Sequence, residues 1–361
     1  MEKNDKWKIK SKILYLSFNQ DHDCLAVGMG AGYRIYDLKN SSLNFYERTI
    51  DGGVNIIEML HRTNILALVG VGRSKEYPKN KVLIFDDNIG KTITELSFKI
   101  AVQSVKFKKE LMVVVCGNTI DVISLPSFKK IETIETELKC VNKTILFALN
   151  VQNPEKHILA HNGKVTGEVI VNNYAENPKT FEKVKAFTSE NACISCLEFN
   201  KIGNILAVTG EYNKYIKLYK TDEGVKLIYR FIISDRSLNT VFLSFEENTD
   251  FLCASLEDGL IEIFDLRDLN QKNDLSFSKK DNYIGFGNVL SDYNQGKVIT
   301  DTRWGYFYIH EHRAVCTFSV IPYHIICIGS KANYYLTKFD ENKKGSLGYR
   351  EEEKSLLYIH S

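Results

Sequence analysis

The chain has 361 residues, a formal net charge of +2 and 44% hydrophobic residues. Nucleic-acid-binding proteins usually carry a large basic excess, so this balance argues against general nucleic-acid binding. The sequence has no run of about 18 apolar residues, which is the length of a membrane-spanning helix. Its first residues also lack the apolar core of a signal peptide, so we expect a cytoplasmic protein.

Along the chain, a pair of apolar strands joined by a short polar turn recurs. Short alternating or continuous apolar runs bounded by turn residues are typical of β-strands, and no long stretch has helical periodicity. The predicted pairs, in chain order, span residues 24–28 with 33–37, 65–70 with 81–86, 111–116 with 120–125, 158–161 with 167–171, 205–210 with 215–219, 251–255 with 260–265, and 325–329 with 334–339.

These pairs repeat at intervals of about 40 to 50 residues, the period of a four-stranded propeller blade. The last interval is longer by about 30 residues, which indicates an insertion between Leu266 and Trp304. We therefore predict an all-β, seven-bladed WD-type β-propeller that occupies residues 1–361 as a single domain. The first strand group lies near 11–51, the last near 314–360, and a long sixth-blade loop spans about 267–303. A closed ring has no long exposed sheet edge, so we expect a monomer.

No residue pattern of an enzyme or a metal site is present. His157 with His161, and His310 with His312, have ligand-like spacing but no third ligand nearby. The eight cysteines are expected to be reduced core residues, and the isolated Cys193-x-x-Cys196 pair has no second pair to complete a metal site. The sequence predicts a non-catalytic protein with no cofactor and no metal.

Four segments carry a family resemblance: Phe18–Asp21, Ile57–Gly70, Val82–Asp87 and Phe251–Ser255. With Trp304 after the insertion, they resemble the PROPPIN family, the WIPI-type autophagy propellers. The resemblance implies a cytosolic scaffold that docks on phosphoinositide-bearing membranes and recruits autophagy proteins.

In the family, lipid binding depends on an F/L-R-R-G motif at the end of the fifth blade, where two arginines serve two phosphate pockets. The matching positions here are Phe231, Ile232, Ile233 and Ser234, so both arginines are absent. The family histidine of the fifth blade falls on Glu190. The basic and hydroxyl positions of the sixth-blade pocket fall on Asp258, Leu260 and Glu262, whereas Ser255 is kept. Acidic and apolar groups at these positions predict that phosphoinositide binding is weakened or lost.

Asn19 and Asp21, in the first-blade turn, match a polar pair that contacts the autophagy lipid-transfer protein in the family. The resemblance therefore implies a partner-binding role for both residues. The alternative is an ordinary Asx turn between two strands, where Asn and Asp are common.

The insertion matches the family's sixth-blade membrane loop and combines apolar side chains with lysines, a composition that suits weak insertion at an anionic membrane surface. The candidate residues are Phe277, Lys279, Lys280, Tyr283, Ile284 and Phe286. The alternative is a loop that folds back on the propeller rim.

The favoured hypothesis is thus a scaffold that recruits a lipid-transfer or other autophagy protein, at most peripherally at autophagosomal or endosomal membranes. Two alternatives stay open. One is an effector that binds phosphatidylinositol 3-phosphate or 3,5-bisphosphate through an altered pocket. The other is a generic WD-repeat complex subunit without a membrane role.

Overall fold

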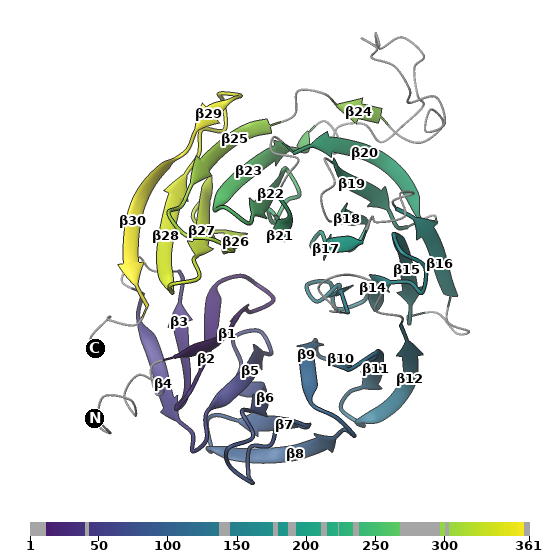
Figure 1. Cartoon of the computed structure of the whole chain (residues 1–361), viewed down its shortest axis with the longest axis vertical. Coiled ribbons are helices and arrows are strands. Elements are labelled where there is room, and N and C mark those ends of the chain that lie inside the picture. Colours follow the sequence, from purple (N-terminus) through teal and green to yellow (C-terminus); the bar gives the residue numbers. More distant parts are fainter. Residues whose placement is uncertain are drawn as a thin grey trace.

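The computed structural model describes residues 12–39, 43–136, 145–175, 180–186, 193–210, 215–222, 224–233, 238–267, 297–299 and 303–356. These residues form seven β-sheets that surround a central axis as the blades of a propeller (Figure 1). The predicted seven-bladed fold is confirmed. No helix in the described part of the chain is long and apolar enough to cross a membrane.

The strands of each blade run outward from the axis in chain order. Blade 1 holds β1 (Ile13–Phe18), β2 (Cys24–Met29), β3 (Gly32–Asp37) and β4 (Phe45–Thr49). Blade 2 holds β5 (Val54–Met59), β6 (Ile65–Gly70), β7 (Lys81–Asp86) and β8 (Lys91–Ser97). Blade 3 holds β9 (Val102–Phe107), β10 (Leu111–Cys116), β11 (Thr119–Ser124) and β12 (Lys129–Glu135). Blade 4 holds β13 (Phe147–Leu149), β14 (Ile158–Asn162), β15 (Glu168–Asn173) and β16 (Thr180–Lys185).

Blades 5 and 6 each carry an added fifth strand at the outer edge, whereas blade 7 again has four. Blade 5 holds β17 (Ile194–Phe199), β18 (Ile205–Gly210), β19 (Tyr215–Lys220), β20 (Lys226–Ile232) and the added β24 (Lys297–Ile299). Blade 6 holds β21 (Thr240–Phe245), β22 (Phe251–Leu256), β23 (Leu260–Asp265), β25 (Arg303–Tyr308) and the added β29 (Ser346–Leu347). Blade 7 holds β26 (Val315–Phe318), β27 (His324–Ile328), β28 (Asn333–Lys338) and β30 (Tyr349–Ser355).

The strand pairs predicted from the sequence are the two middle strands of each blade. These strands read as continuous apolar runs because both of their faces are covered by neighbouring blades. Every residue of β10 is buried, for example, and so is every residue of β22. In each of the outermost strands β8 and β12, the fourth and sixth residues are partly buried and the other residues are exposed.

The chain leaves blade 6 after β23 and returns to it at β25. Residues 297–299, near the end of the predicted insertion, form β24, which pairs in parallel with β20 on the outer edge of blade 5 (Figure 1). The insertion therefore contacts the strand that carries the fifth-blade motif positions. The membrane-loop candidates Phe277, Lys279, Lys280, Tyr283, Ile284 and Phe286 lie outside the described residues.

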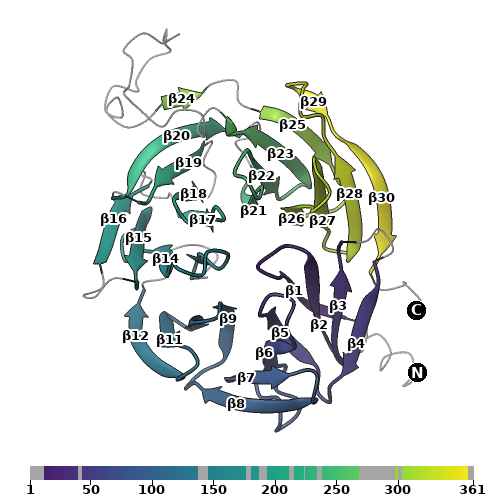
Figure 2. The same ribbon diagram turned by 180° about the vertical axis from the view of Figure 1, so that it is seen from behind.

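The innermost strands have one common register, which makes their residues comparable between blades. After each of these strands, the next residue donates its backbone N–H to a carbonyl at or next to the start of the second strand, as Asn19 does to Cys24 and Asn200 to Ile205. The equivalent first turn residues are Asn19, Leu60, Lys108, Asn150, Asn200, Glu246 and Ser319. Figure 2, seen from behind, shows β1, β5, β9, β17, β21 and β26 around the central opening.

The ring closes between blade 7 and blade 1 without a strand shared by the two sheets in the described chain. One apolar cluster joins them, with Leu25 and Val27 of β2 packed with Ile326 and Ile328 of β27. The Tyr36 hydroxyl also donates to the Leu356 carbonyl, at 2.5 Å. Side-chain packing therefore holds the last junction of the ring.

Candidate functional site

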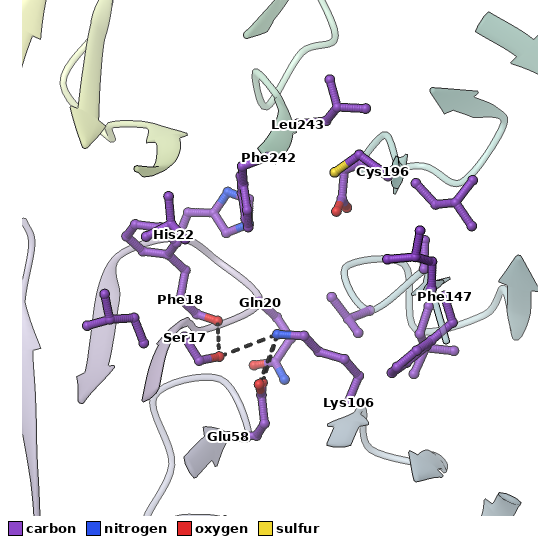
Figure 3. A pocket seen from close by; sticks show the side chains of 18 of the residues that line it. Ser17, Phe18, Gln20, His22, Glu58, Lys106, Phe147, Cys196, Phe242 and Leu243 are labelled. Carbon is purple, nitrogen blue, oxygen red and sulfur yellow. Dashed lines mark hydrogen bonds and ion pairs between the residues drawn. The ribbon is translucent and has the colours of Figure 1, made fainter. Parts of the chain in front are cut away.

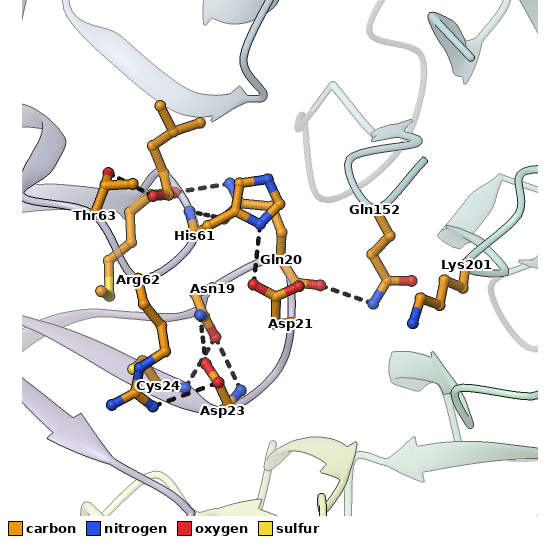
Figure 4. A network of polar contacts seen from close by, with 12 residues as sticks. Asn19, Gln20, Asp21, Asp23, Cys24, His61, Arg62, Thr63, Gln152 and Lys201 are labelled. Atoms are coloured by element: carbon orange, nitrogen blue, oxygen red, sulfur yellow. Dashed lines mark hydrogen bonds and ion pairs between the residues drawn. The ribbon is translucent and has the colours of Figure 1, made fainter. Parts of the chain in front are cut away.

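The first-blade turn is built around Asn19, which is 2% exposed. Its side-chain Oδ1 accepts hydrogen bonds from the backbone N–H groups of Asp23 (3.0 Å) and Cys24 (2.9 Å). Its Nδ2 donates to Asp23 Oδ1 at 2.7 Å (Figure 4). All of these contacts lie within the turn, so Asn19 has a structural role there, although its bonds reach residues four and five positions on and not two on, as they would in an Asx turn.

Blade 5 repeats this arrangement. Asn200, the equivalent residue, accepts from the backbone N–H groups of Asn204 (3.0 Å) and Ile205 (2.9 Å), and its Nδ2 donates to Asn204 Oδ1 at 2.7 Å. The same bonds in a blade that carries no matching acidic residue indicate that the asparagine shapes the turn.

Asp21 is the accessible member of the predicted pair. Its side chain is 50% exposed and lies 3.0 Å from His61 Nδ1, measured from Asp21 Oδ2. The neighbouring Gln20 is buried and ties the turn to blades 2 and 3, because its Nε2 donates to the carbonyls of Met59 (2.7 Å) and Phe107 (2.9 Å). Asp21 therefore projects from a turn that is fixed on the molecule (Figure 4).

Next to Asp21 lies a group of ion pairs centred on Arg62. This guanidinium approaches Asp23 Oδ2 at 3.4 Å and Asp37 Oδ2 at 3.2 Å, and Lys39 Nζ lies 2.9 Å from Asp23 Oδ2. Burial opposes the ionisation of Asp23, but hydrogen bonds from Lys39 and Asn19 and the charge of Arg62 outweigh it and lower the pKa of this carboxyl. The surface beside Asp21 is charged with both signs.

The fifth-blade motif positions point into apolar packing. Phe231 and Ile233 are each 1% exposed and belong to one core cluster, in which the ring of Phe231 lies 5.3 Å from that of Phe264. Ile232 is partly buried and pairs in register with Tyr215. The neighbouring Arg230 is 5% exposed, so it is not available on the surface in place of the missing arginines. Ser234 and Glu190 lie outside the described residues.

The sixth-blade positions also lack a cation that could face a phosphate. Glu262 is fully buried, and Arg303 Nη1 lies 3.4 Å from its Oε1. Asp258 accepts the Leu260 backbone N–H at 2.9 Å, which forms the turn between β22 and β23, and Leu260 is buried. Ser255 is buried, and its hydroxyl has no hydrogen-bond partner among the described residues.

Comparison with known proteins decides the family. The family model described as PROPPIN matches residues 13–346. The chain belongs to the PROPPIN family. Among its relatives, SVP1-like protein 2 of Debaryomyces hansenii is 26% identical over 297 residues, which cover 74% of this chain and 68% of that protein. Autophagy-related protein 18e of Arabidopsis thaliana is 28% identical over 265 residues, which cover 73% of this chain and 68% of that protein.

Solved structures have the same fold at lower identity. Hsv2 of Kluyveromyces lactis with its complete loop 6CD superposes with a TM-score of 0.75 at 18% identity, over 95% of this chain and 99% of that one. An Atg21 structure in complex with the coiled coil of Atg16 superposes with a TM-score of 0.71 at 18% identity, over 95% and 99% of the two chains. The chain is thus an autophagy β-propeller of the PROPPIN family.

Among the described cysteines, all but one follow the sequence prediction. Six are free in the described part of the chain: Cys24, Cys116, Cys196, Cys253, Cys316 and Cys327. Cys193, in contrast, is disulfide-bonded, so the expectation that all eight are reduced is wrong for this residue. The described residues contain no group of three or more His, Cys, Asp or Glu side chains that could hold a metal ion.

Inside the PROPPIN propeller lies a set of mostly polar residues that was not predicted from the sequence. The residue one position before the end of each innermost strand has the same register in all seven blades; we call these seven residues, six of which are polar, the polar tier. Its members are Ser17, Glu58, Lys106, Ala148, Glu198, Ser244 and Thr317. Five of them line a cavity of about 260 Å³ along the axis: Ser17, Glu58, Lys106, Ala148 and Glu198. The cavity is open to solvent and reaches the first-blade turn at Asn19 and Gln20.

Proposed function

We propose that this PROPPIN is a non-catalytic autophagy scaffold that recruits a protein partner and binds phosphoinositides weakly or not at all. Its action is at most peripheral, at autophagosomal or endosomal membranes. Two features go beyond the family's role in autophagy: the weak or absent binding of phosphoinositides and the recruitment of a protein partner.

The burial of the fifth-blade motif positions supports the loss of lipid binding. A phosphoinositide headgroup carries several negative charges and requires cationic hydrogen-bond donors. Phe231 and Ile233 offer none and are each 1% exposed. In blade 6, Arg303 lies against the buried Glu262, and that carboxylate would compete with a phosphate for the guanidinium.

Vesicle flotation tests the lipid statement. We expect the purified chain to float equally little with vesicles that contain or lack phosphatidylinositol 3-phosphate, at physiological salt. A relative that keeps the two motif arginines serves as the positive control. Micromolar, headgroup-selective binding would instead favour the alternative, an effector with an altered pocket.

For the partner, Asp21 and its charged surroundings are the candidate surface. The family resemblance points to a lipid-transfer protein, and the related Atg21 structure holds a coiled coil of Atg16, so a protein partner fits both comparisons. Asp21 is half exposed on a turn that is fixed by Gln20, which limits the loss of conformational entropy on binding.

A pull-down of the lipid-transfer protein tests this surface. We expect Asp21→Lys to lose the partner, because it reverses the charge at an exposed position beside His61 and Arg62. The matched control is Asp51→Lys, at another exposed aspartate of the connection between blades 1 and 2. Retention of the partner by Asp21→Lys would remove Asp21 from the binding surface.

A further inference from the structure

The charges of the polar tier do not balance. Lys106 Nζ lies 3.0 Å from both carboxylate oxygens of Glu58, and the Tyr15 hydroxyl donates to Glu58 Oε1 at 2.7 Å. Lys106 also reaches the Ser17 hydroxyl at 3.4 Å (Figure 3). This pair is neutral as a unit, so the second carboxylate of the tier, Glu198, is left without a cation of its own in ion-pair contact among the described side chains.

Burial of Glu198 raises the pKa of its carboxyl to about 7, although the charge of Lys106 and a backbone hydrogen bond from Phe199 lower it. The charged and titratable groups around Glu198 are Lys106 of β9, Glu58 of β5, Cys196 of its own strand, and His22 from the first-blade turn. Burial and the charge of Lys106 lower the pKa of His22 to about 4, so its imidazole is neutral near pH 7.

Most of the remaining cavity wall is apolar or aromatic, although Asn19, Gln20 and Ser195 also line it. Cys196, Phe147 and Phe242 line it, and Phe242 lies beside the His22 ring (Figure 3). The Thr317 hydroxyl lies 2.7 Å from His22 Nδ1 and 3.1 Å from the Ser244 hydroxyl, so these polar groups already have partners. The cavity thus combines one carboxylate that lacks a counter-ion with walls suited to hydrocarbon.

We propose that the central cavity binds a small organic cation, an alkylammonium ion, with its charged group at Glu198 and its hydrocarbon part against Phe147 and Phe242. An ammonium ion supplies the positive charge that Glu198 lacks, and aromatic faces attract cations as well as hydrocarbon. A cavity of about 260 Å³ admits a molecule of this size. This site lies on the axis, away from the outer edges of blades 5 and 6.

The same geometry argues against other ligands. An anion would have to pair with Lys106, but the ammonium group of Lys106 already forms an ion pair with both carboxylate oxygens of Glu58. A metal ion would need several ligating side chains, and the described residues provide no group of three. A neutral alcohol could fill the apolar part but would bring no positive charge to Glu198.

Titration calorimetry or ligand-detected NMR with n-butylammonium tests the proposal on the intact chain. The controls are 1-butanol and butyrate, which keep the carbon chain and remove or reverse the charge. We expect saturable 1:1 binding of n-butylammonium and at least tenfold weaker binding of both controls. Equal binding of 1-butanol or butyrate, or no binding of n-butylammonium, would overturn the proposal.

Variants locate the site. Glu198→Gln should weaken n-butylammonium binding at least tenfold, whereas Glu155→Gln, at an exposed glutamate, should leave it unchanged. Cys196→Met keeps every charge but extends a side chain into the cavity, so it should also weaken binding. This second variant covers the case in which Glu198→Gln alters the fold. Unchanged binding in Cys196→Met would place the cation elsewhere.

The pH dependence gives an independent signature. Because Glu198 must be ionised to hold the cation, binding should strengthen by about tenfold from pH 6 to pH 8. Glu198→Gln should lose this dependence. An equal affinity at both pH values in the unmodified chain would contradict the assignment of Glu198.

Discussion

Asn19 stabilises the first-blade turn through three side-chain hydrogen bonds, to Asp23 and Cys24. Asn19→Ala removes them and leaves buried N–H groups without acceptors, so we expect the free energy of unfolding to fall by about 1 to 3 kcal/mol. Asp21→Ala, at the exposed neighbouring position, should change it by less than about 0.5 kcal/mol. Urea denaturation of both variants measures the difference.

The equivalent Asn200→Ala serves as the control for this prediction, because Asn200 makes the same backbone contacts in blade 5. A similar loss of stability in both asparagine variants would show that the residue acts on the turn. If Asn19→Ala kept full stability but lost the partner, Asn19 would have to be assigned to partner contact.

His22 makes the free energy of unfolding depend on pH below about 6.5. The pKa of its imidazole is about 4 in the folded protein, below the ordinary value of 6.5, because burial and Lys106 disfavour the charged form. Below pH 6.5 the unfolded chain takes up a proton that the folded chain does not. Stability should therefore fall as the pH drops from 6.5 to about 4, by about 1 to 3 kcal/mol from this residue.

His22→Gln removes this titration and keeps a polar side chain near Thr317. We expect the stability of this variant to decline less over the same pH range, measured by denaturation at several pH values. The substitution His310→Gln, at an exposed histidine, should not alter the decline. An unchanged pH profile in His22→Gln would mean that other groups cause the acid sensitivity.

At the scale of the strand, β20 limits how the lipid motif can be restored. Ile232 is partly buried, whereas Ile233 is 1% exposed in the core between blades 5 and 6. An arginine at 233 would bring an unpaired charge into that core, so Ile233→Arg should cost about 3 to 5 kcal/mol. Ile232→Arg alone should cost much less.

Thermal denaturation and vesicle flotation of the single and double variants measure both effects. The double variant should recover at most a small part of phosphoinositide binding, because Glu262 and Asp258 remain. A stable double variant with full headgroup-selective binding would show that β20 can rearrange into the family geometry.

The middle strands could be predicted from the sequence almost residue by residue, since two covered faces require long apolar runs such as Leu111–Cys116. The innermost strands were harder to interpret. The equivalent positions near their ends share no residue type, as Ser17, Lys106 and Ala148 show. A weak signal was present: in five blades the tier residue directly precedes a phenylalanine, as in Ser17-Phe18 and Glu198-Phe199.

The site residues were predictable only as positions in a family pattern. That Ile232 and Ile233 replace arginines is visible in the sequence, but the burial of Ile233 depends on packing with Phe264 and Leu266 of the next blade. The prediction of Asn19 as a contact residue was limited in the same way, because the polarity of a side chain does not reveal whether the turn itself uses it.

For the whole molecule, the junction between blades 7 and 1 should be the first to open. The other neighbouring blades are linked by the chain, whereas this junction depends on side-chain contacts: the packing around Leu25, the bonds from Tyr36 and Arg34 to the Leu356 carbonyl, and the bond between Thr317 and His22. Leu25→Ala should cost about 2 to 5 kcal/mol and speed hydrogen exchange in β26–β28. Leu66→Ala, at the equivalent buried position of blade 2, should cost a similar amount without that local effect.

Native-state hydrogen exchange followed by mass spectrometry distinguishes these outcomes. The prediction would be contradicted by equal exchange of β26–β28 in the two variants, because the junction would then be as firmly held as the others.

In the described part of the chain, blades 1 and 7 share no strand, so the ring of sheets has no unique beginning. In each of the first four blades the strands follow one another without a break in the sequence, so the polypeptide could start at another blade boundary and build the same sheets. The connection between β8 and β9, residues 98–101, is one such boundary. Circular permutation of the gene at a blade boundary is therefore compatible with this architecture. In a propeller whose last blade is completed by the first strand of the chain, such a permutation would divide a sheet.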